Sequence, residues 1–187
     1  MSAADGYRWD GESARSLGAL LGVPEVVLLE STPSTLDVAH ERAARGAPVR
    51  LKWPNDLQVD DRKLAGILVE ARWRDGALDW LAVGMGVNVR VPDRVPDAAG
   101  LPHAMSRVEP LAALVPALRE AARRTGPLSE GELAEYATRD VAAGRRCVEP
   151  MVGTVQGIAP GGELLVSTGS EVALARAGSL RFAGEDG

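Results

Sequence analysis

The chain has 187 residues, of which 45% are hydrophobic and 25% are charged, and its formal net charge is -5. This composition fits a globular protein with one mid-sized domain, or one domain with a small appendage, and it excludes a disordered chain. No apolar run of about eighteen residues is present, so no membrane association is expected, and the acidic balance argues against general binding to nucleic acid.

Metal and disulfide chemistry are limited by the residues available. Cys147 is the only cysteine, and the two histidines, His40 and His103, lie far apart in the chain. An internal disulfide is therefore impossible, a zinc site is disfavoured, and any metal is expected to arrive with a nucleotide. The first residues carry no basic region followed by an apolar stretch, so we expect a cytoplasmic protein without a secretion signal.

The predicted elements begin with a helix and change to strands near residue 49. Leucines at helical spacing predict a helix over residues 12–21, and a strand over 25–29 and a helix over 34–45 follow. Four apolar segments then predict strands, with turns at Asp60-Asp61 and Asp75-Gly76. These strands are expected over residues 49–53, 57–59, 64–73 and 78–91.

The second half of the chain predicts helices and then short strands. A proline-containing loop over residues 91–108 precedes two helices, over 110–124 and 129–140. Short β segments separated by glycines follow, over 145–155, 163–167, 171–175 and 179–182. We therefore predict an α+β fold with a mixed or antiparallel sheet and helices over residues 1–142, followed by a small β-barrel over 143–187. Consecutive apolar residues over 66–69 and 81–83 predict strands covered on both faces, with helices packed on at least one side.

The densest group of chemically useful residues lies between residues 51 and 70. It contains the only two lysines, in the segments Lys52-Trp53-Pro54-Asn55-Asp56-Leu57 and Lys63-Leu64-Ala65-Gly66-Ile67-Leu68-Val69-Glu70. A chain that otherwise uses arginine has lysine where a compact ammonium on a flexible stem is useful. On spacing alone, Lys63 is typical of an exposed hairpin residue that pairs with Asp60 or Asp61, and Trp53 is typical of a core residue.

These two segments resemble the central signature of biotin protein ligases. A further strand of that family is similar to Val83-Gly84-Met85-Gly86-Val87-Asn88-Val89, and its substrate loop is similar to Ser31-Thr32-Pro33-Ser34-Thr35. The glycine pattern after Gly144 resembles the family's small SH3-like cap. The resemblance covers most of residues 26–182. It implies a class II synthetase-like core that takes biotin and ATP with Mg²⁺ as substrates and has no bound prosthetic group. The implied partner is the biotin carboxyl carrier domain of a carboxylase.

The resemblance also implies a reaction in two steps, formation of biotinyl-5'-AMP and transfer of biotin to a carrier lysine. Lys63 is expected to lie between the biotin carboxylate and the α-phosphate and to lower their repulsion. Asp56 is expected to hold magnesium or to orient the acceptor lysine, unless it only bonds within its own turn. Asn88 is expected to read the adenine edge. The glycines provide a flat surface for a ring, or else thin the strand for helix packing. The residues expected to contact biotin or ATP are Ser31, Thr32, Lys52, Asn55, Gly66, Gly84, Gly86 and Asn88.

One element of that family is missing from the chain. No G-R-G-R-x-G-R motif, which wraps the adenylate in the family, occurs in the sequence, and Gly46-Ala47-Pro48 runs directly into residue 49. This is typical of an internal deletion at 48/49, which predicts uncovered apolar surface, either lowered stability or association with another chain, for instance as a homodimer, and weakened catalysis. The alternatives are a biotin- or carrier-binding remnant that makes no adenylate, and a lipoate-type ligase. A repressor is disfavoured, because too few residues precede the first strand for a winged helix-turn-helix domain.

Overall fold

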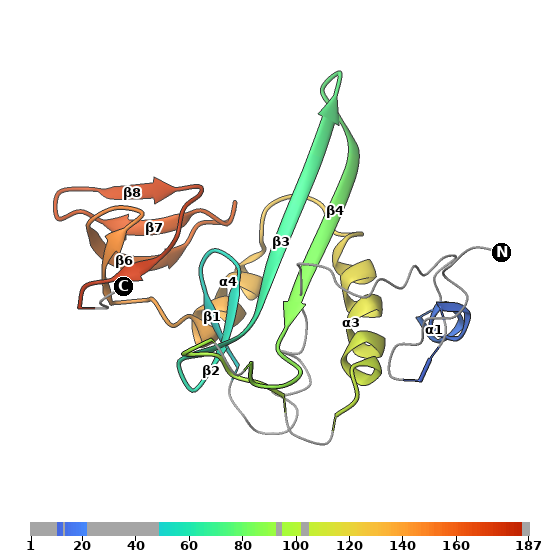
Figure 1. The fold of residues 1–187 in the computed structure, drawn as a ribbon. Helices are drawn as coiled ribbons and strands as arrows, with labels where there is room; N and C mark the ends of the chain where they lie inside the picture. Colours follow the sequence, from blue (N-terminus) through green and yellow to red (C-terminus); the bar gives the residue numbers. More distant parts are fainter. Residues whose placement is uncertain (1–10, 13, 22–48, 93–94, 102–104, 185–187) are drawn as a thin grey trace.

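The computed structural model describes residues 11–12, 14–21, 49–92, 95–101 and 105–184. Its first sheet has four antiparallel strands in the order β1-β2-β3-β4 (Figure 1). The predicted strands of this region are confirmed, although the last one ends at Val87 and not at residue 91. The strand expected over 25–29 and the helix over 34–45 lie outside the described residues. The strands are β1 Arg50–Lys52, β2 Asp56–Val59, β3 Arg62–Arg74 and β4 Ala77–Val87.

Both tight turns of the first sheet have the backbone geometry that two-residue hairpins require. Asp60 and Asp61 have φ angles of 51° and 58°, and Asp75 and Gly76 have φ angles of 51° and 81°. Two consecutive residues with positive φ give a turn whose twist matches that of the flanking strands, and Asp and Gly tolerate this region. The two predicted turns are confirmed, and the first of them places Lys63 at the start of β3.

The base of the first sheet carries its own hydrophobic core. Leu64 and Ala65 of β3 are 0% and 2% exposed, and they pack with buried side chains of the neighbouring strands. The loop after β4 contributes Ala99 and Leu101 to the same core, which anchors this loop beside the start of β3. The remaining buried members are Val49, Leu57 and Val59.

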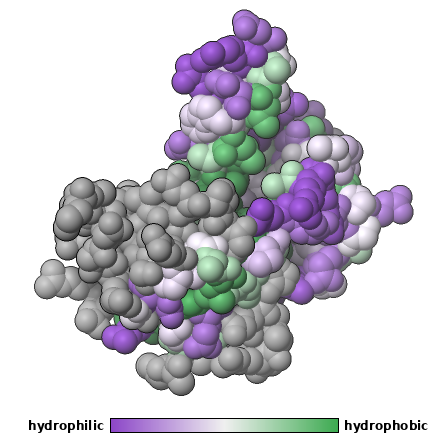
Figure 2. Space-filling model, turned by 90° about the vertical axis from the view of Figure 1, so that its right-hand side faces the viewer, coloured by the Kyte–Doolittle hydropathy of each residue, from purple (hydrophilic) through white to green (hydrophobic). Residues whose placement is uncertain are grey.

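The outer part of the β3–β4 hairpin is exposed on both faces. Leu68 and Val69 of β3 are 54% and 53% exposed, and Leu81 and Val83 of β4 are 47% and 40% exposed. The hairpin projects from the rest of the molecule in Figure 1, and Figure 2 shows apolar residues along its shaft below a hydrophilic tip. The prediction that helices cover these strands is therefore wrong, whereas the expectation of uncovered apolar surface is confirmed. An apolar run marks a buried strand only where both of its faces meet a neighbour.

Three helices lie within the described ranges. The first, α1 Ala14–Leu21, lies against α3 Val108–Ala121, and the third, α4 Glu130–Arg139, contacts β1. None of these helices is long and apolar enough to cross a membrane. The contact of α4 with β1 matters for the site, because it connects the end of the helical region to the strand that carries Lys52.

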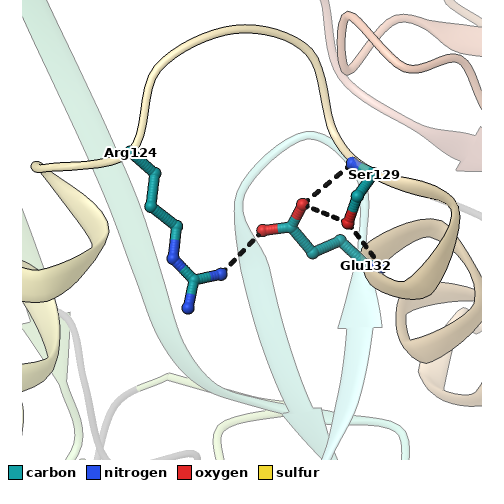
Figure 3. Close-up of polar contacts among 3 residues, drawn as sticks. All are labelled: Arg124, Ser129 and Glu132. Atoms are coloured by element: carbon teal, nitrogen blue, oxygen red, sulfur yellow. Dashed lines mark hydrogen bonds and ion pairs between the residues drawn. The ribbon is translucent and has the colours of Figure 1, made fainter.

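The start of α4 is closed by reciprocal hydrogen bonds between Ser129 and Glu132 (Figure 3). Ser129 Oγ accepts a hydrogen bond from the Glu132 backbone N–H at 3.3 Å, and Glu132 Oε2 accepts one from the Ser129 N–H at 2.8 Å. Arg124 Nη1 donates to Glu132 Oε1 at 3.0 Å. The hydrogen bond from the Ser129 backbone, followed by those from the Ser129 hydroxyl and Arg124, lowers the pKa of Glu132. Such a capping box satisfies N–H groups that a helix start otherwise leaves unpaired.

Replacing Ser129 by alanine is expected to lower the free energy of unfolding by about 1 kcal/mol, because one backbone N–H of the first turn loses its acceptor. Urea denaturation measures this loss. Ser170→Ala, at an exposed serine between β7 and β8, is the matched control and is expected to change stability by less than about 0.5 kcal/mol. Equal losses in the two variants would contradict the capping role.

The second sheet is built from the C-terminal part of the chain. It has five antiparallel strands in the order β8-β7-β6-β5-β9. The predicted short strands are confirmed, except that the first is divided into two strands by a turn at 150–152. Closure of this sheet into an SH3-like barrel stays a prediction. The strands are β5 Arg146–Glu149, β6 Gly153–Ile158, β7 Leu164–Ser167, β8 Val172–Ala175 and β9 Arg181–Phe182.

Trp53 connects the two sheets. It follows β1 in the chain, yet it is 5% exposed within the core of the second sheet, whose members include Cys147, Val155 and Phe182. Its indole Nε1 donates a hydrogen bond to the Gly162 carbonyl at 3.0 Å. The prediction that Trp53 is a core residue is confirmed, but the core belongs to the C-terminal sheet.

Candidate functional site

Four residues expected in the site form one row across the first sheet. Lys52 of β1 is paired with Asp56 of β2, Asp56 with Gly66 of β3, and Gly66 with Gly86 of β4. Residues directly opposite one another in neighbouring strands point to the same face of a sheet. The register therefore brings these residues together on a single face, although three turns separate them along the chain.

The centre of this row is an ion pair between Lys63 and Asp56. The Lys63 Nζ lies 2.6 Å from Asp56 Oδ1. Both groups lie directly above Gly66, because a Cβ atom at this position would be 3.1 Å from Asp56 Oδ1 and 3.3 Å from Lys63 Nζ. Pairing of Lys63 with Asp60 or Asp61, which spacing alone favoured, is not what the structure shows. Gly66 thus leaves space that the ammonium and the carboxylate occupy.

The ion pair remains open to an incoming ligand. The side chain of Lys63 is 54% exposed and that of Asp56 is 25% exposed. An ammonium has three N–H groups, so one that is paired with a single carboxylate oxygen keeps donors for a further partner. Lys63 can therefore bind an anion without first leaving Asp56.

Glycines extend the same face along β3 and β4. Gly86 is paired with Gly66, and Gly84 is paired with Leu68 one step further along the hairpin. Because successive side chains alternate between faces, Gly84 and Gly86 share the face of Gly66. This arrangement places the three glycines on the face that carries the Lys63 ammonium, where Gly66 and Gly84 are half-buried and Gly86 is buried. A flat surface for a ring stays a prediction.

The two asparagines of the expected site donate hydrogen bonds to backbone groups. Asn55 Nδ2 donates to the Ile67 carbonyl at 2.6 Å, and Asn88 Nδ2 donates to the Lys63 carbonyl at 3.1 Å. Both carbonyls belong to β3, on either side of Gly66. Direct contacts of Asn55 and Asn88 with a ligand stay predictions, and so does the reading of adenine by Asn88.

Lys52 has an aromatic neighbour that sequence reasoning missed. Its Nζ lies 5.2 Å from the centre of the Phe182 ring, and the guanidinium carbon of Arg145 lies 3.4 Å from the same ring. A cation over an aromatic face is attracted by the ring quadrupole. The C-terminal sheet therefore contacts the end of the site row. No local pattern links Lys52 to a residue so distant in the chain, so only the fold reveals this contact.

The chain segment after α4 fastens the helical region to β1. Arg50 Nη2 donates to the Asp140 backbone carbonyl at 3.0 Å, and the Val141 N–H donates to the Leu51 carbonyl at 3.0 Å. The Asp140 side chain is buried, and its Oδ1 accepts a hydrogen bond from the Ala142 N–H at 2.8 Å. Burial raises the pKa of Asp140, while hydrogen bonds from backbone N–H groups and the charge of Arg50 oppose this shift.

The raised pKa of Asp140 predicts a dependence of stability on pH. Between the ordinary pKa of Asp and the raised value, the folded state holds a proton that the unfolded state has lost. The free energy of unfolding is therefore expected to fall as pH rises through this window. Asp140→Asn is expected to reduce this fall, which urea denaturation at several pH values above about 4 measures. Glu171→Gln, at an exposed carboxylate, serves as control, and identical pH profiles for native protein and Asp140→Asn would contradict the prediction.

A metal site formed by the protein itself was not expected. Within the described part of the chain, no three or more His, Cys, Asp or Glu side chains converge. Asp56, the expected contact of magnesium, pairs with Lys63. Ser31 and Thr32, the expected contacts of biotin, lie outside the described residues.

Comparison of the sequence with known proteins gives a match over the first half of the chain. Residues 15–88 match the Biotin/lipoate A/B protein ligase family. The bifunctional ligase/repressor BirA of Escherichia coli is 54% identical over 41 residues, which are 22% of this chain and 13% of that protein. "Biotin--protein ligase 1, chloroplastic" of Arabidopsis thaliana is 38% identical over 64 residues, which are 34% of this chain and 17% of that protein. The matched segment therefore spans less than a fifth of each of these relatives.

Comparison of the fold covers more of the chain. A biotin protein ligase from Aquifex aeolicus in complex with biotin and ATP has a TM-score of 0.59 at 22% identity, over 78% of this chain and 66% of that chain. A biotin protein ligase-like protein of unknown function from Silicibacter has a TM-score of 0.53 at 19% identity, over 87% of this chain and 66% of that chain. The chain thus shares the fold of biotin protein ligases, and its residues 15–88 carry the sequence pattern of the Biotin/lipoate A/B protein ligase family.

Proposed function

We propose that the chain is an ATP-dependent biotin protein ligase that forms biotinyl-5'-AMP and transfers biotin to a lysine of a biotin carboxyl carrier domain. The observation that carries this proposal is the half-exposed Lys63 side chain, whose ammonium lies 2.6 Å from Asp56 Oδ1 above Gly66. The match of residues 15–88 to the ligase family supports it. A location in the cytoplasm stays a prediction.

The first step brings two anions together. An oxygen of the biotin carboxylate attacks the α-phosphorus of ATP, a new oxygen–phosphorus bond forms, and the bond to pyrophosphate breaks. An ammonium in contact with both reactants lowers their repulsion and stabilises the charge that develops. Lys63 fits this role, because its amine is paired with Asp56 and its side chain is half-exposed. Magnesium arrives with ATP and shields the phosphates that leave.

The second step joins biotin to the carrier. The amine of the carrier lysine, after losing a proton, attacks the acyl carbon of the adenylate, and AMP leaves with the electrons of the broken carbon–oxygen bond. Asp56 is the carboxylate nearest to Lys63, so it is our candidate for orienting this amine. Gly66 and Gly84, which are half-buried on the same face, are our candidates for the flat surface under the ring of biotin or adenine.

A second candidate function is a protein that binds biotin or the carrier and makes no adenylate. The missing G-R-G-R-x-G-R motif favours it, because arginines of that motif would supply charge that the described site does not replace. A lipoate-type ligase is a third candidate, against which the Lys52–Leu57 signature counts.

The test is incubation of the purified chain with biotin, magnesium ATP and a carrier domain. Release of pyrophosphate and addition of biotin to the carrier, read by mass spectrometry, support the ligase. Binding of biotin by calorimetry without pyrophosphate release supports the binding remnant instead. Parallel reactions with lipoate identify the third candidate, and a chain that neither binds nor activates biotin would overturn both biotin proposals.

We also propose that the exposed hairpin associates with a second copy of the chain. Among the described residues, β4 pairs only with β3, and its exposed side chains include Leu81 at 47% and Val83 at 40%. An apolar edge strand is a template for pairing, and a lysine on it opposes such pairing. Leu81→Lys is therefore expected to shift the protein toward monomer in sedimentation velocity. Val148→Lys, at a 41% exposed valine of β5, which is paired on both sides, is the control. A chain that is already monomeric at high concentration would contradict this proposal.

A further inference from the structure

The backbone of Lys63 is held by three hydrogen bonds. Its N–H donates to the Asp97 carbonyl at 2.8 Å. Its carbonyl accepts from the Ala99 N–H at 2.8 Å and from Asn88 Nδ2 at 3.1 Å. A carbonyl oxygen has two lone pairs, so these two donors saturate it. The position from which the Lys63 side chain extends is thus fixed on both sides of the residue.

Asn88 is itself held firmly. Its backbone N–H donates to the Leu64 carbonyl at 3.0 Å, and its backbone carbonyl accepts from the Leu101 N–H at 3.0 Å. Leu64 and Leu101 are both buried in the core of the first sheet. The backbone of Asn88 therefore has little freedom, and its carboxamide is a fixed donor that faces the start of β3.

We infer that Asn88 is a positioning residue for Lys63. The importance of this role for catalysis rests on the proposed ligase function. The short carboxamide reaches the Lys63 carbonyl and fixes the direction of the side chain toward Gly66 and Asp56. An aspartate at this position would direct a carboxylate oxygen at the Lys63 carbonyl oxygen, and both groups are acceptors. A leucine, which is of similar size, would leave one lone pair of the Lys63 carbonyl without a donor. The role differs from the adenine contact expected from sequence, because Asn88 acts through Lys63.

Asn55 makes the corresponding contact on the other side of Gly66. Its side-chain Nδ2 donates a hydrogen bond to the Ile67 backbone carbonyl at 2.6 Å. The backbone carbonyl of Asn55 accepts one from the Ile67 N–H at 2.8 Å. Asn55 immediately precedes Asp56, so this pair of bonds fixes the start of the strand that carries the carboxylate. Asn88 thus holds the backbone of Lys63, and Asn55 holds the strand start that carries Asp56.

The chain offers a direct readout of the Lys63 amine, because Lys52 and Lys63 are its only lysines. Labelling lysine with ¹⁵N and ¹³C gives two side-chain signals by NMR, which Lys52→Arg and Lys63→Arg assign. In the native protein, Asp56→Asn is expected to shift the Lys63 signal. In Asn88→Leu, the Lys63 signal is expected to shift while that of Lys52 stays, and the added effect of Asp56→Asn is expected to shrink.

The inference would be overturned if folded Asn88→Leu had an unchanged Lys63 signal and if adding Asp56→Asn to it shifted that signal as much as in the native protein. If Asn88→Leu does not fold, Asn88→Ser, whose side chain is too short to reach the Lys63 carbonyl, is measured in the same way. Gln156→Leu, at an exposed amide of β6, controls for loss of a carboxamide. Because this experiment needs no activity, its result stands even if the ligase proposal fails.

Kinetics add a second readout if the chain forms adenylate. Positioning through Lys63 predicts that Asn88→Leu lowers kcat, by up to about 100-fold for a misplacement near 1 Å, and that it has little further effect when Lys63 is already replaced. A direct contact with adenine predicts a higher KM for ATP, with an unchanged Lys63 NMR signal and additive effects. The latter pattern would assign Asn88 to ligand binding and overturn positioning.

Discussion

Replacing Lys63 by methionine is expected to lower the rate of biotinyl-adenylate formation by about 100- to 1000-fold, the size of effect found when one donor to a developing negative charge is removed. Methionine preserves much of the length of the side chain but has no charge and no N–H group. The loss is expected in kcat, because the ammonium acts mainly when the biotin carboxylate meets the α-phosphate. Pyrophosphate release in the presence of biotin and magnesium ATP measures this rate.

The matched control is Arg62→Met. Arg62 is adjacent in the chain, its side chain is 51% exposed, and its nearest acidic partner is Asp60 at 4.0 Å, away from Asp56. Its replacement also removes one positive charge at the start of β3, but it leaves the pair above Gly66 in place. Adenylate formation that is lost equally in both variants would indicate a general effect of charge, and undiminished activity in Lys63→Met would refute the assignment of Lys63.

Replacing Trp53 by alanine is expected to lower the free energy of unfolding by about 3 to 5 kcal/mol. The indole is 5% exposed, fills the core of the C-terminal sheet, and donates a hydrogen bond to the Gly162 carbonyl. Its loss leaves a cavity and removes one of the contacts between the β1 region and this sheet, another being that of Lys52 with Phe182. Chemical denaturation followed by circular dichroism measures the effect. Two transitions in Trp53→Ala, in place of one, would show that the sheets then unfold separately.

Two further tryptophan variants separate the causes. Trp53→Phe keeps an aromatic ring but removes the N–H donor and part of the bicyclic ring, so its loss is expected to exceed about 1 kcal/mol for the hydrogen bond and to stay below that of Trp53→Ala. Trp73→Ala removes a tryptophan of the projecting hairpin that is 65% exposed, and a change of less than about 0.5 kcal/mol is expected. A loss in Trp53→Ala no larger than that in Trp73→Ala would contradict the packing of Trp53 between the sheets.

Local patterns were sufficient to predict most of the elements. The turns at Asp60-Asp61 and Asp75-Gly76 follow from residues that tolerate positive φ, and the strands beside them follow from apolar runs between these turns. The same patterns, with the resemblance, located Lys63, Asp56 and the glycines of one candidate site. Each of these predictions depends on residues close together in the chain, where backbone sterics and turn chemistry act directly.

Coverage of the strands could not be predicted in this way. The apolar residues of the β3–β4 hairpin have the pattern of a buried strand, yet Leu68 and Val69 are about half exposed. Whether an apolar residue is buried depends on which other elements pack against it in the folded protein. An apolar run in the sequence does not show whether such a neighbour exists. The hairpin therefore looks buried in sequence and is open in the structure.

The sequence by itself determined which residues carry chemistry and where the chain turns, because these are properties of single side chains and short segments. Only the tertiary structure decided that Lys63 pairs with Asp56, that Asn88 holds the Lys63 carbonyl, and that Phe182 lies beside Lys52. These contacts depend on strand register and on the path of a chain that brings distant segments together. A shift of one residue in register would turn Asp56 to the opposite face, and no local pattern specifies that register by itself.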